Sequence, residues 1–162
     1  MKKLGFLGAG NMGSAIIKGI AKSGLDVEMF AYHKAAEKLE ELKKYGVKPC
    51  KSEAELAEKC DYILLAVKPQ VLGEILDKLK GAVGENHVFI SICAGISSEF
   101  IKSHTCSKVR TAIVMPNTPA MLGVGASAIA RDEAISDDEF DFTKKVIESC
   151  GLVKEIPMDK MK

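Results

Sequence analysis

The sequence predicts an α/β fold in which a mainly parallel, doubly wound sheet carries helices on both faces. Apolar runs of strand length recur with little polar alternation, as in strands that are buried on both faces. Segments of helical period separate these runs, which is the pattern of βαβ units with right-handed crossovers. A glycine-rich turn joins the first run to the first helical segment, which indicates the Rossmann type.

The elements follow one another in a regular order. Apolar runs predict strands at residues 3–7, 27–32, 62–67, 88–92 and 109–114. Helical period is found at residues 12–22, 35–44, 69–80 and 97–103. Beyond the proline-bounded break at 115–119, we expect a strand at 125–130, a helix at 136–149 and a last strand at 152–156. A chain of 162 residues suits one core, so we expect residues 1–162 to form a single domain.

Three helix starts are marked by local signals. Ser52 with Glu55, and Ser136 with Glu139, match the capping box, in which the serine oxygen accepts a hydrogen bond from the N–H of the third helical residue. Pro69 suits a first helical position, because the N–H that proline lacks would be unpaired there. These signals set the phase of the alternation between strands and helices.

Composition excludes several classes of protein. The net charge of +1 gives no general attraction to nucleic acid or to an anionic membrane, and no apolar stretch reaches the length of a membrane span. The five cysteines are widely spaced without a C-x-x-C pair, and the histidines show no ligand spacing. We therefore expect reduced thiols, a cytoplasmic location, no metal site, and no nucleic-acid or membrane partner.

Residues 8–13 form a G-x-G-x-x-G motif between the first strand and the first helix. Gly8 permits a tight turn, Gly10 lets the backbone approach a pyrophosphate, and Gly13 allows the helix to pack closely on the strand. The helix start adds unpaired amides and a positive dipole end. This context predicts dinucleotide binding; the alternative is a glycine-rich turn with no ligand.

The second strand ends at Tyr32, His33 and Lys34, without the carboxylate that NAD-specific domains place against the ribose hydroxyls. Lys34, with His33, is able to pair with a 2′-phosphate, so we expect NADP (NADPH) to be preferred, with NAD still possible. The alternative is that Lys34 is only a solvated residue at a helix start, and Glu37 and Glu40 lie near it in sequence.

Three later strand ends carry further candidates. Lys68 follows the 62–67 strand, where a cation would lie near the cofactor's ribose or diphosphate; the alternative is a surface lysine before a helix. Cys93 lies among small residues that suit contact with a flat nicotinamide ring. We interpret Cys93 as an apolar spacer rather than a nucleophile. Asn117, between two prolines, is placed to meet the nicotinamide amide or a substrate carboxylate; the alternative is an Asx turn.

The segments G-A-G-N-M-G at 8–13, A-V-K-P at 66–69, C-A-G-I at 93–96 and M-P-N-T-P-A at 115–120 resemble, in order and spacing, those of pyrroline-5-carboxylate reductases. The resemblance covers essentially the whole chain. It implies an NAD(P)H-dependent imine reductase that converts 1-pyrroline-5-carboxylate, a cyclic imine carboxylate, to L-proline in proline biosynthesis. The nicotinamide supplies a hydride to the imine carbon.

The resemblance also implies which residues bind the ligands, although it assigns no catalytic residue or proton donor. It places around the cofactor Leu7, Gly8, Ala9, Gly10, Asn11, Met12, Gly13, His33, Lys34, Ala66, Val67, Lys68, Pro69, Ile92, Cys93 and Ala94. It places Asn117 and Thr118 near the substrate.

Two departures from the family pattern bear on these expectations. Ile113 stands where the family usually has an arginine two residues before the methionine, and the nearest arginine is Arg110, so a local ion pair is missing or rerouted. The family is homo-oligomeric and continues into helices that form the dimer interface and complete the substrate pocket, whereas this chain stops at Lys162. We therefore expect a monomer or weak dimer that binds cofactor and turns over substrate slowly or not at all by itself.

Two other functions fit parts of the same pattern. Another Rossmann oxidoreductase, such as a β-hydroxyacid dehydrogenase or an F420-dependent NADP reductase, would share the glycine motif but not the combination of the A-V-K-P and M-P-N-T-P-A segments. A non-catalytic NAD(P)-binding module would bind NADPH without reducing an imine.

Overall fold

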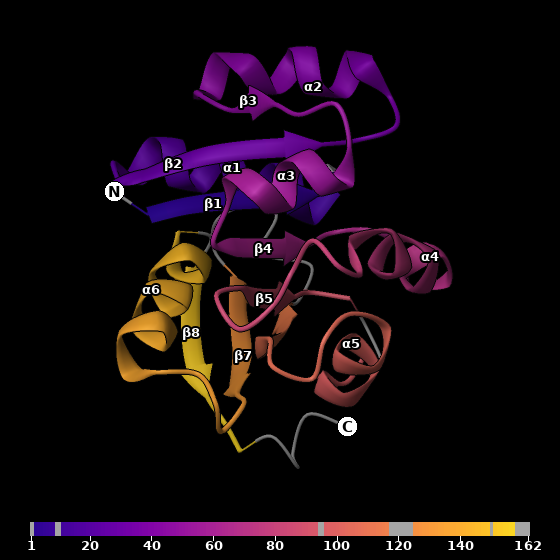
Figure 1. Cartoon of the computed structure of the whole chain (residues 1–162). Helices are drawn as coiled ribbons and strands as arrows, with labels where there is room; N and C mark the ends of the chain where they lie inside the picture. Colours follow the sequence, from indigo (N-terminus) through magenta and orange to yellow (C-terminus); the bar gives the residue numbers. More distant parts are fainter. Residues whose placement is uncertain (1, 9–10, 94–95, 117–124, 150, 158–162) are drawn as a thin grey trace.

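The computed structural model describes residues 2–8, 11–93, 96–116, 125–149 and 151–157. Within these ranges the chain forms an eight-stranded sheet with helices on both faces (Figure 1). The strands are β1 (Lys2–Leu7), β2 (Val27–Tyr32), β3 (Lys48–Pro49), β4 (Tyr62–Leu65), β5 (Val88–Ser91), β6 (Arg110–Pro116), β7 (Gly125–Arg131) and β8 (Gly151–Glu155). The helices are α1 (Asn11–Ser23), α2 (Ala36–Leu42), the 3₁₀ turn η1 (Lys43–Tyr45), α3 (Glu53–Lys59), α4 (Pro69–Leu79), α5 (Ser98–His104) and α6 (Asp137–Glu148).

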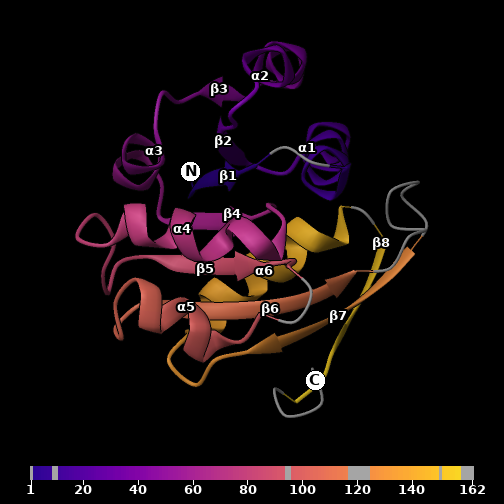
Figure 2. The same cartoon turned by 90° about the vertical axis from the view of Figure 1, so that its right-hand side faces the viewer.

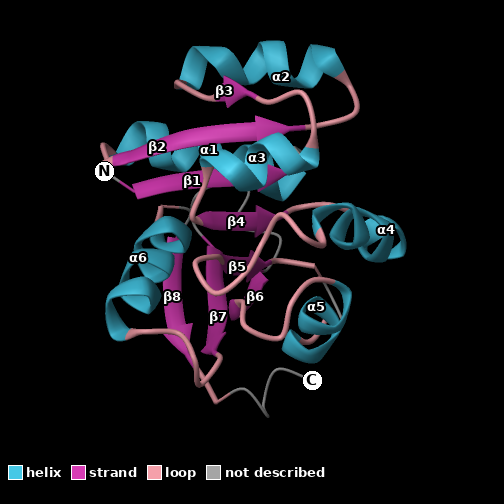
Figure 3. Cartoon of the chain, in the orientation of Figure 1, coloured by secondary structure: helices cyan, strands magenta, loops and turns pink. Residues whose placement is uncertain are grey.

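The strand order is β3-β2-β1-β4-β5-β6-β7-β8, so β3 and β8 form the two edges of the sheet (Figure 3). The chain builds outward from β1 through β2 to β3, and then crosses back to continue from β4 on the other side of β1. All neighbouring pairs are parallel except β6 with β7, which run antiparallel. The predicted mainly parallel, doubly wound sheet is confirmed, and its order reverses between β1 and β4.

Two apolar layers hold the helices against the sheet. Tyr62 and Leu64 of β4 lie in the layer that includes α1 and α6, whereas Ile63 and Leu65 lie in the layer that includes α3, α4 and α5. Figure 2 shows α4 and α5 in front of the strands and α6 behind them. Successive side chains of a strand point to opposite faces, and both faces are covered here, so the strand sequence is continuously apolar.

Most element boundaries agree with the sequence patterns, and the exceptions have local causes. The expected strand at 62–67 ends at Leu65, and the expected helix at 35–44 divides into α2 and the η1 turn. The two-residue strand β3 was not predicted, because so short an element has no periodicity. Helix α3 was marked only by its cap at Ser52.

The helix starts predicted at Ser52, Pro69 and Ser136 are confirmed, and the full capping box is formed at Ser136. Ser52 Oγ accepts a hydrogen bond from the Glu55 N–H at 3.1 Å. Ser136 forms both arms of a capping box with Glu139, at 3.0 and 3.1 Å. Pro69 opens α4 as expected. In the described ranges, no helix combines the length and apolar composition needed to cross a bilayer.

Candidate functional site

The candidate site lies where the carboxyl ends of β1, β2 and β4 meet. The Gly8 N–H donates to the Tyr32 carbonyl oxygen at 2.9 Å, and the Ala66 N–H donates to the Leu7 carbonyl oxygen at 2.9 Å. These bonds join the three strand ends just beyond the strands themselves. In open α/β sheets a ligand binds at such a reversal of strand order, outside the carboxyl ends.

Two glycines of the motif are closely packed against the residue that follows β4. Gly8 adopts φ +89°, and a Cβ there would lie 2.7 Å from the Ala66 carbonyl oxygen. A Cβ on Gly13 would lie 3.0 Å from the Ala66 Cβ, which is tighter than nine in ten such contacts. The turn and the first part of α1 are therefore pressed against the end of β4. Helix α1 starts at Asn11, so the first-turn N–H groups, which lack a partner within the helix, lie at this end of the sheet.

The end of β2 presents nitrogen donors. His33 is half-buried, and its Nδ1 accepts a hydrogen bond from the Ala35 N–H at 2.9 Å. In the neutral ring this bond puts the proton on Nε2, which becomes the donor. Lys34 is exposed beside it. The segment therefore offers donors and a positive charge, and the carboxylates that follow it belong to α2.

Hydrogen bonds connect the carboxyl ends of β4 and β5. The Ile92 N–H donates to the Leu65 carbonyl oxygen at 3.3 Å, and the Cys93 thiol donates to the Val67 carbonyl oxygen at 3.1 Å. Ala66 and Val67 are half-buried, whereas Lys68 is exposed at the N-cap of α4 and Pro69 is exposed behind it. This arrangement brings the A-V-K-P segment and the end of β5 to the same edge of the sheet.

Cys93 does not have the properties of a nucleophile. It is 6% exposed, and burial raises the pKa of its thiol despite opposing hydrogen bonds. The protonated thiol acts as a donor to the β4 end, which agrees with the interpretation of this residue as a spacer.

Several expected site residues lie outside the described residues, and the structure says nothing of them. They are Ala9, Gly10, Ala94, Asn117 and Thr118. The backbones of Asn11 and Met12 are described as the start of α1, without their side chains. Met115, the first residue of the M-P-N-T-P-A segment, is 47% exposed. In the described part of the chain, no group of three or more His, Cys, Asp or Glu residues is arranged to hold a metal ion.

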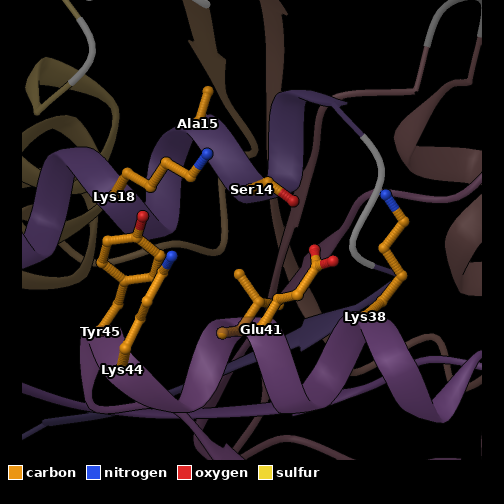
Figure 4. A pocket seen from close by; sticks show the side chains of 8 residues that line it. Ser14, Ala15, Lys18, Lys38, Glu41, Lys44 and Tyr45 are labelled. Atoms are coloured by element: carbon orange, nitrogen blue, oxygen red, sulfur yellow. The ribbon is translucent and has the colours of Figure 1, made fainter.

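A cavity that the sequence analysis missed lies between α1 and α2. We call it the α1–α2 pocket; its volume is about 400 Å³ (Figure 4). It is lined by Ser14, Ala15, Lys18, Lys38, Glu41, Leu42, Lys44 and Tyr45. The sequence did contain a signal for this lining. Residues three or four apart share a helix face, and this spacing separates residues 14 and 18, and residues 38, 41 and 45.

Comparisons with known proteins agree with this geometry. Residues 3–95 match the protein family described as NADP oxidoreductase coenzyme F420-dependent. Pyrroline-5-carboxylate reductase 2 of Bacillus subtilis is 34% identical over 98% of this chain and 59% of the relative. The solved pyrroline carboxylate reductase of Plasmodium falciparum, with NADP bound, is 31% identical with a TM-score of 0.85, over 99% of this chain and 59% of that one.

The pyrroline-5-carboxylate reductase of Coxiella burnetii superposes with a TM-score of 0.89 at 26% identity, over 94% of this chain and 58% of that one. The chain thus spans a little under three fifths of the length of these relatives.

Proposed function

We propose that this chain, which belongs to the family described as NADP oxidoreductase coenzyme F420-dependent, is the dinucleotide-binding part of a pyrroline-5-carboxylate reductase. In this proposal residues 1–162 form one domain that binds NADPH in preference to NADH. The reaction is the reduction of 1-pyrroline-5-carboxylate to L-proline. The free thiols described at Cys50, Cys60, Cys93 and Cys106 support a cytoplasmic location.

The observation that carries the proposal is the close packing at Gly8. The positive φ and the 2.7 Å approach to the Ala66 carbonyl leave space only for hydrogen, and the first turn of α1, whose N–H groups have no partner within the helix, adjoins it. A turn of this shape lets a pyrophosphate reach the backbone and the positive end of the helix. A glycine-rich turn that binds no ligand could lie anywhere in the fold, whereas this one lies where the strand order reverses between β1 and β4.

The remaining expected residues lie at the ends of different strands, and each group would bind a different part of the cofactor. His33 and Lys34, at the end of β2, would bind the adenosine ribose and its phosphate. Ala66 to Pro69, with Ile92 to Ala94, would hold the nicotinamide half. Bound there, the reduced nicotinamide supplies a hydride. Asn117 and Thr118 would orient the substrate, whose cyclic imine accepts the hydride once its nitrogen is protonated.

The choice of an imine substrate depends on how far each similarity extends. The family match ends at residue 95, so it covers the glycine turn and the ends of β4 and β5. The similarity to the Bacillus subtilis reductase covers 98% of this chain and so includes the M-P-N-T-P-A segment. The resemblance places Asn117 and Thr118 of that segment near the substrate, so the longer similarity favours the imine over other substrates of the family.

Turnover requires more than these residues in our proposal, because the relatives are substantially longer than this chain. The test is a fluorescence titration of the purified chain with NADPH and with NADH, followed by addition of pyrroline-5-carboxylate. We expect NADPH to bind more tightly than NADH, and the imine to cause slow or no oxidation. If neither nucleotide binds, the proposal is wrong. Rapid oxidation would show that the active site is complete in these residues.

A further inference from the structure

We propose that Cys93 is a positioning residue for the nicotinamide half of the cofactor, because its thiol hydrogen bond to the Val67 carbonyl oxygen fixes the A-V-K-P segment against the glycine turn. This inference rests on the proposed dinucleotide function. It gives Cys93 a role that depends on its S–H group and not only on its small apolar volume.

This hydrogen bond lies just beyond the end of the backbone ladder between β4 and β5. The two strands run side by side and parallel, and Leu65 is paired with Ser91 at the end of both (Figure 2). The Ile92 N–H still donates to the Leu65 carbonyl oxygen at 3.3 Å. Two residues beyond the last pair, Cys93 Sγ lies 3.1 Å from the Val67 carbonyl oxygen. The thiol therefore continues the connection between the strands past the backbone ladder.

Val67 is also in contact with the glycine turn. A Cβ added to Gly8 would lie 2.7 Å from Val67 Cγ1 and 2.7 Å from the Ala66 carbonyl oxygen, so both residues are already close to the turn. The A-V-K-P segment thus contacts the turn that would bind the pyrophosphate and the strand end that would bind the nicotinamide. A shift of the Val67 backbone would change the position of one relative to the other.

The surroundings of Cys93 hold its thiol in place as a donor. The side chain is 6% exposed, and a second contact places Sγ 3.5 Å from the Leu65 carbonyl oxygen. The Cys93 N–H donates to Ser91 Oγ at 3.3 Å, and Ser91 is fully buried. Burial raises the pKa of the Cys93 thiol, so it keeps the proton that it donates. Without this donor, the half-buried Val67 carbonyl would need another partner, and the segment would move with it.

Two substitutions separate the donor from the volume of the side chain. A buried cysteine behaves both as a small apolar group and as a weak S–H donor. Cys93→Val keeps an apolar side chain and removes the donor, whereas Cys93→Ser keeps a donor on a smaller side chain. An apolar spacer would be replaced better by valine, and a hydrogen-bonding positioning residue would be replaced better by serine.

The experiment is a calorimetric titration of the purified chain and its variants with NADPH and with adenosine 2′,5′-bisphosphate, which lacks the nicotinamide half. Cys93→Val should weaken NADPH binding roughly three- to tenfold, the effect of one lost hydrogen bond, and leave bisphosphate binding within about twofold. Cys93→Ser should retain more of the NADPH affinity than Cys93→Val. If Cys93→Val does not fold, Cys93→Ala also removes the donor and should change the ratio of the two affinities in the same direction.

The matched control is Cys60→Val. Cys60 is 2% exposed and lies in the same apolar layer as Cys93, but it precedes β4 and so lies at the opposite end of that strand. This substitution should change the thermal unfolding of the chain while leaving the affinities for both probes within about twofold. It shows whether a loss of stability alone changes the ratio of the two affinities.

Each outcome decides between the two proposals. If Cys93→Val weakens both probes equally, binds both as the wild-type chain does, or retains more NADPH affinity than Cys93→Ser, the thiol does not act as a positioning donor and the inference is wrong. An equal change of the affinity ratio in Cys60→Val would also overturn it. In all these cases the dinucleotide function stands. If the wild-type chain binds neither the bisphosphate nor NADPH nor NADH, the proposed function itself is wrong.

Discussion

Arg110 at the start of β6 binds Glu139 in the first turn of α6 with two hydrogen bonds. Arg110 Nε and Nη2 donate to Glu139 Oε1 and Oε2 at 2.8 and 2.6 Å, and both side chains are about one-fifth exposed. Arg110 Nη1 also donates to the Glu85 carbonyl oxygen. Arg110, the arginine nearest to Ile113 in sequence, is thus paired with α6, while Ile113 packs in an apolar layer.

Replacing Arg110 with methionine should destabilise the fold by about 2 kcal/mol, because the largely buried Glu139 carboxylate would lose its charged partner. Urea denaturation followed by circular dichroism measures the change in the free energy of unfolding. Lys59→Met provides the control, since its pair with Glu55 is solvent-exposed and should contribute less than about 1 kcal/mol. Equal effects of the two substitutions would contradict this account.

Stability should depend on pH through Glu139. Burial opposes ionisation of this carboxyl, but the hydrogen bonds from Arg110 and from the Ser136 backbone outweigh it and lower its pKa below 4.5. A lowered folded-state pKa stabilises the protein above the unfolded pKa, and this contribution is lost as pH falls through the folded value. The difference in unfolding free energy between wild type and Glu139→Gln should therefore shrink below about pH 4.5. A difference that is constant from pH 7 to 3 would rule this out.

Gly8→Ala should abolish tight dinucleotide binding and destabilise the chain by about 3 kcal/mol, since it combines a left-handed backbone with a backbone clash. Gly81→Ala is the matched control, because Gly81 has φ +92° and a Cβ added there would meet nothing within 4 Å. It should cost about 1 kcal/mol and leave NADPH affinity unchanged. Calorimetric titration and thermal unfolding of both variants make the comparison.

Gly19→Ala should loosen the packing of α1 on α6. A Cβ at Gly19 would lie 2.5 Å from the Ser149 carbonyl oxygen, so one of the two segments must shift. We expect a loss of about 1 to 3 kcal/mol in unfolding free energy, the usual effect of overpacking. At Gly84 an added Cβ meets nothing within 4 Å, and Gly84→Ala should be neutral or slightly stabilising.

Alkylation should distinguish the described cysteines. Burial raises the pKa of the Cys60 thiol to about 12, and burial also raises the pKa values of Cys50 and Cys93. Cys106 is only half-buried. Iodoacetamide at pH 8 should therefore modify Cys106 in the native protein and reach the other three only after denaturation. Peptide mass spectrometry measures the order, and early labelling of Cys93 would contradict its role as a buried donor.

Local patterns in the sequence were sufficient for much of the fold. Strand β2 was predicted at its observed limits, because a mostly apolar run, interrupted only by Glu28, marks a strand largely covered on both faces. The serine caps and the glycine turn were also predictable, since each depends on residues within a few positions of one another. The candidate cofactor residues followed from the same strand ends, and the resemblance to a family added their individual assignments.

Tertiary structure decided the features that join distant segments. The pairing of Arg110 with Glu139 connects residues 29 positions apart, and the α1–α2 pocket brings Lys38 and Glu41 opposite Ser14. Strand β3 exists only because it pairs with β2. Periodicity and caps report the preferences of a short stretch of chain, whereas these contacts depend on how helices pack on the two faces of the finished sheet.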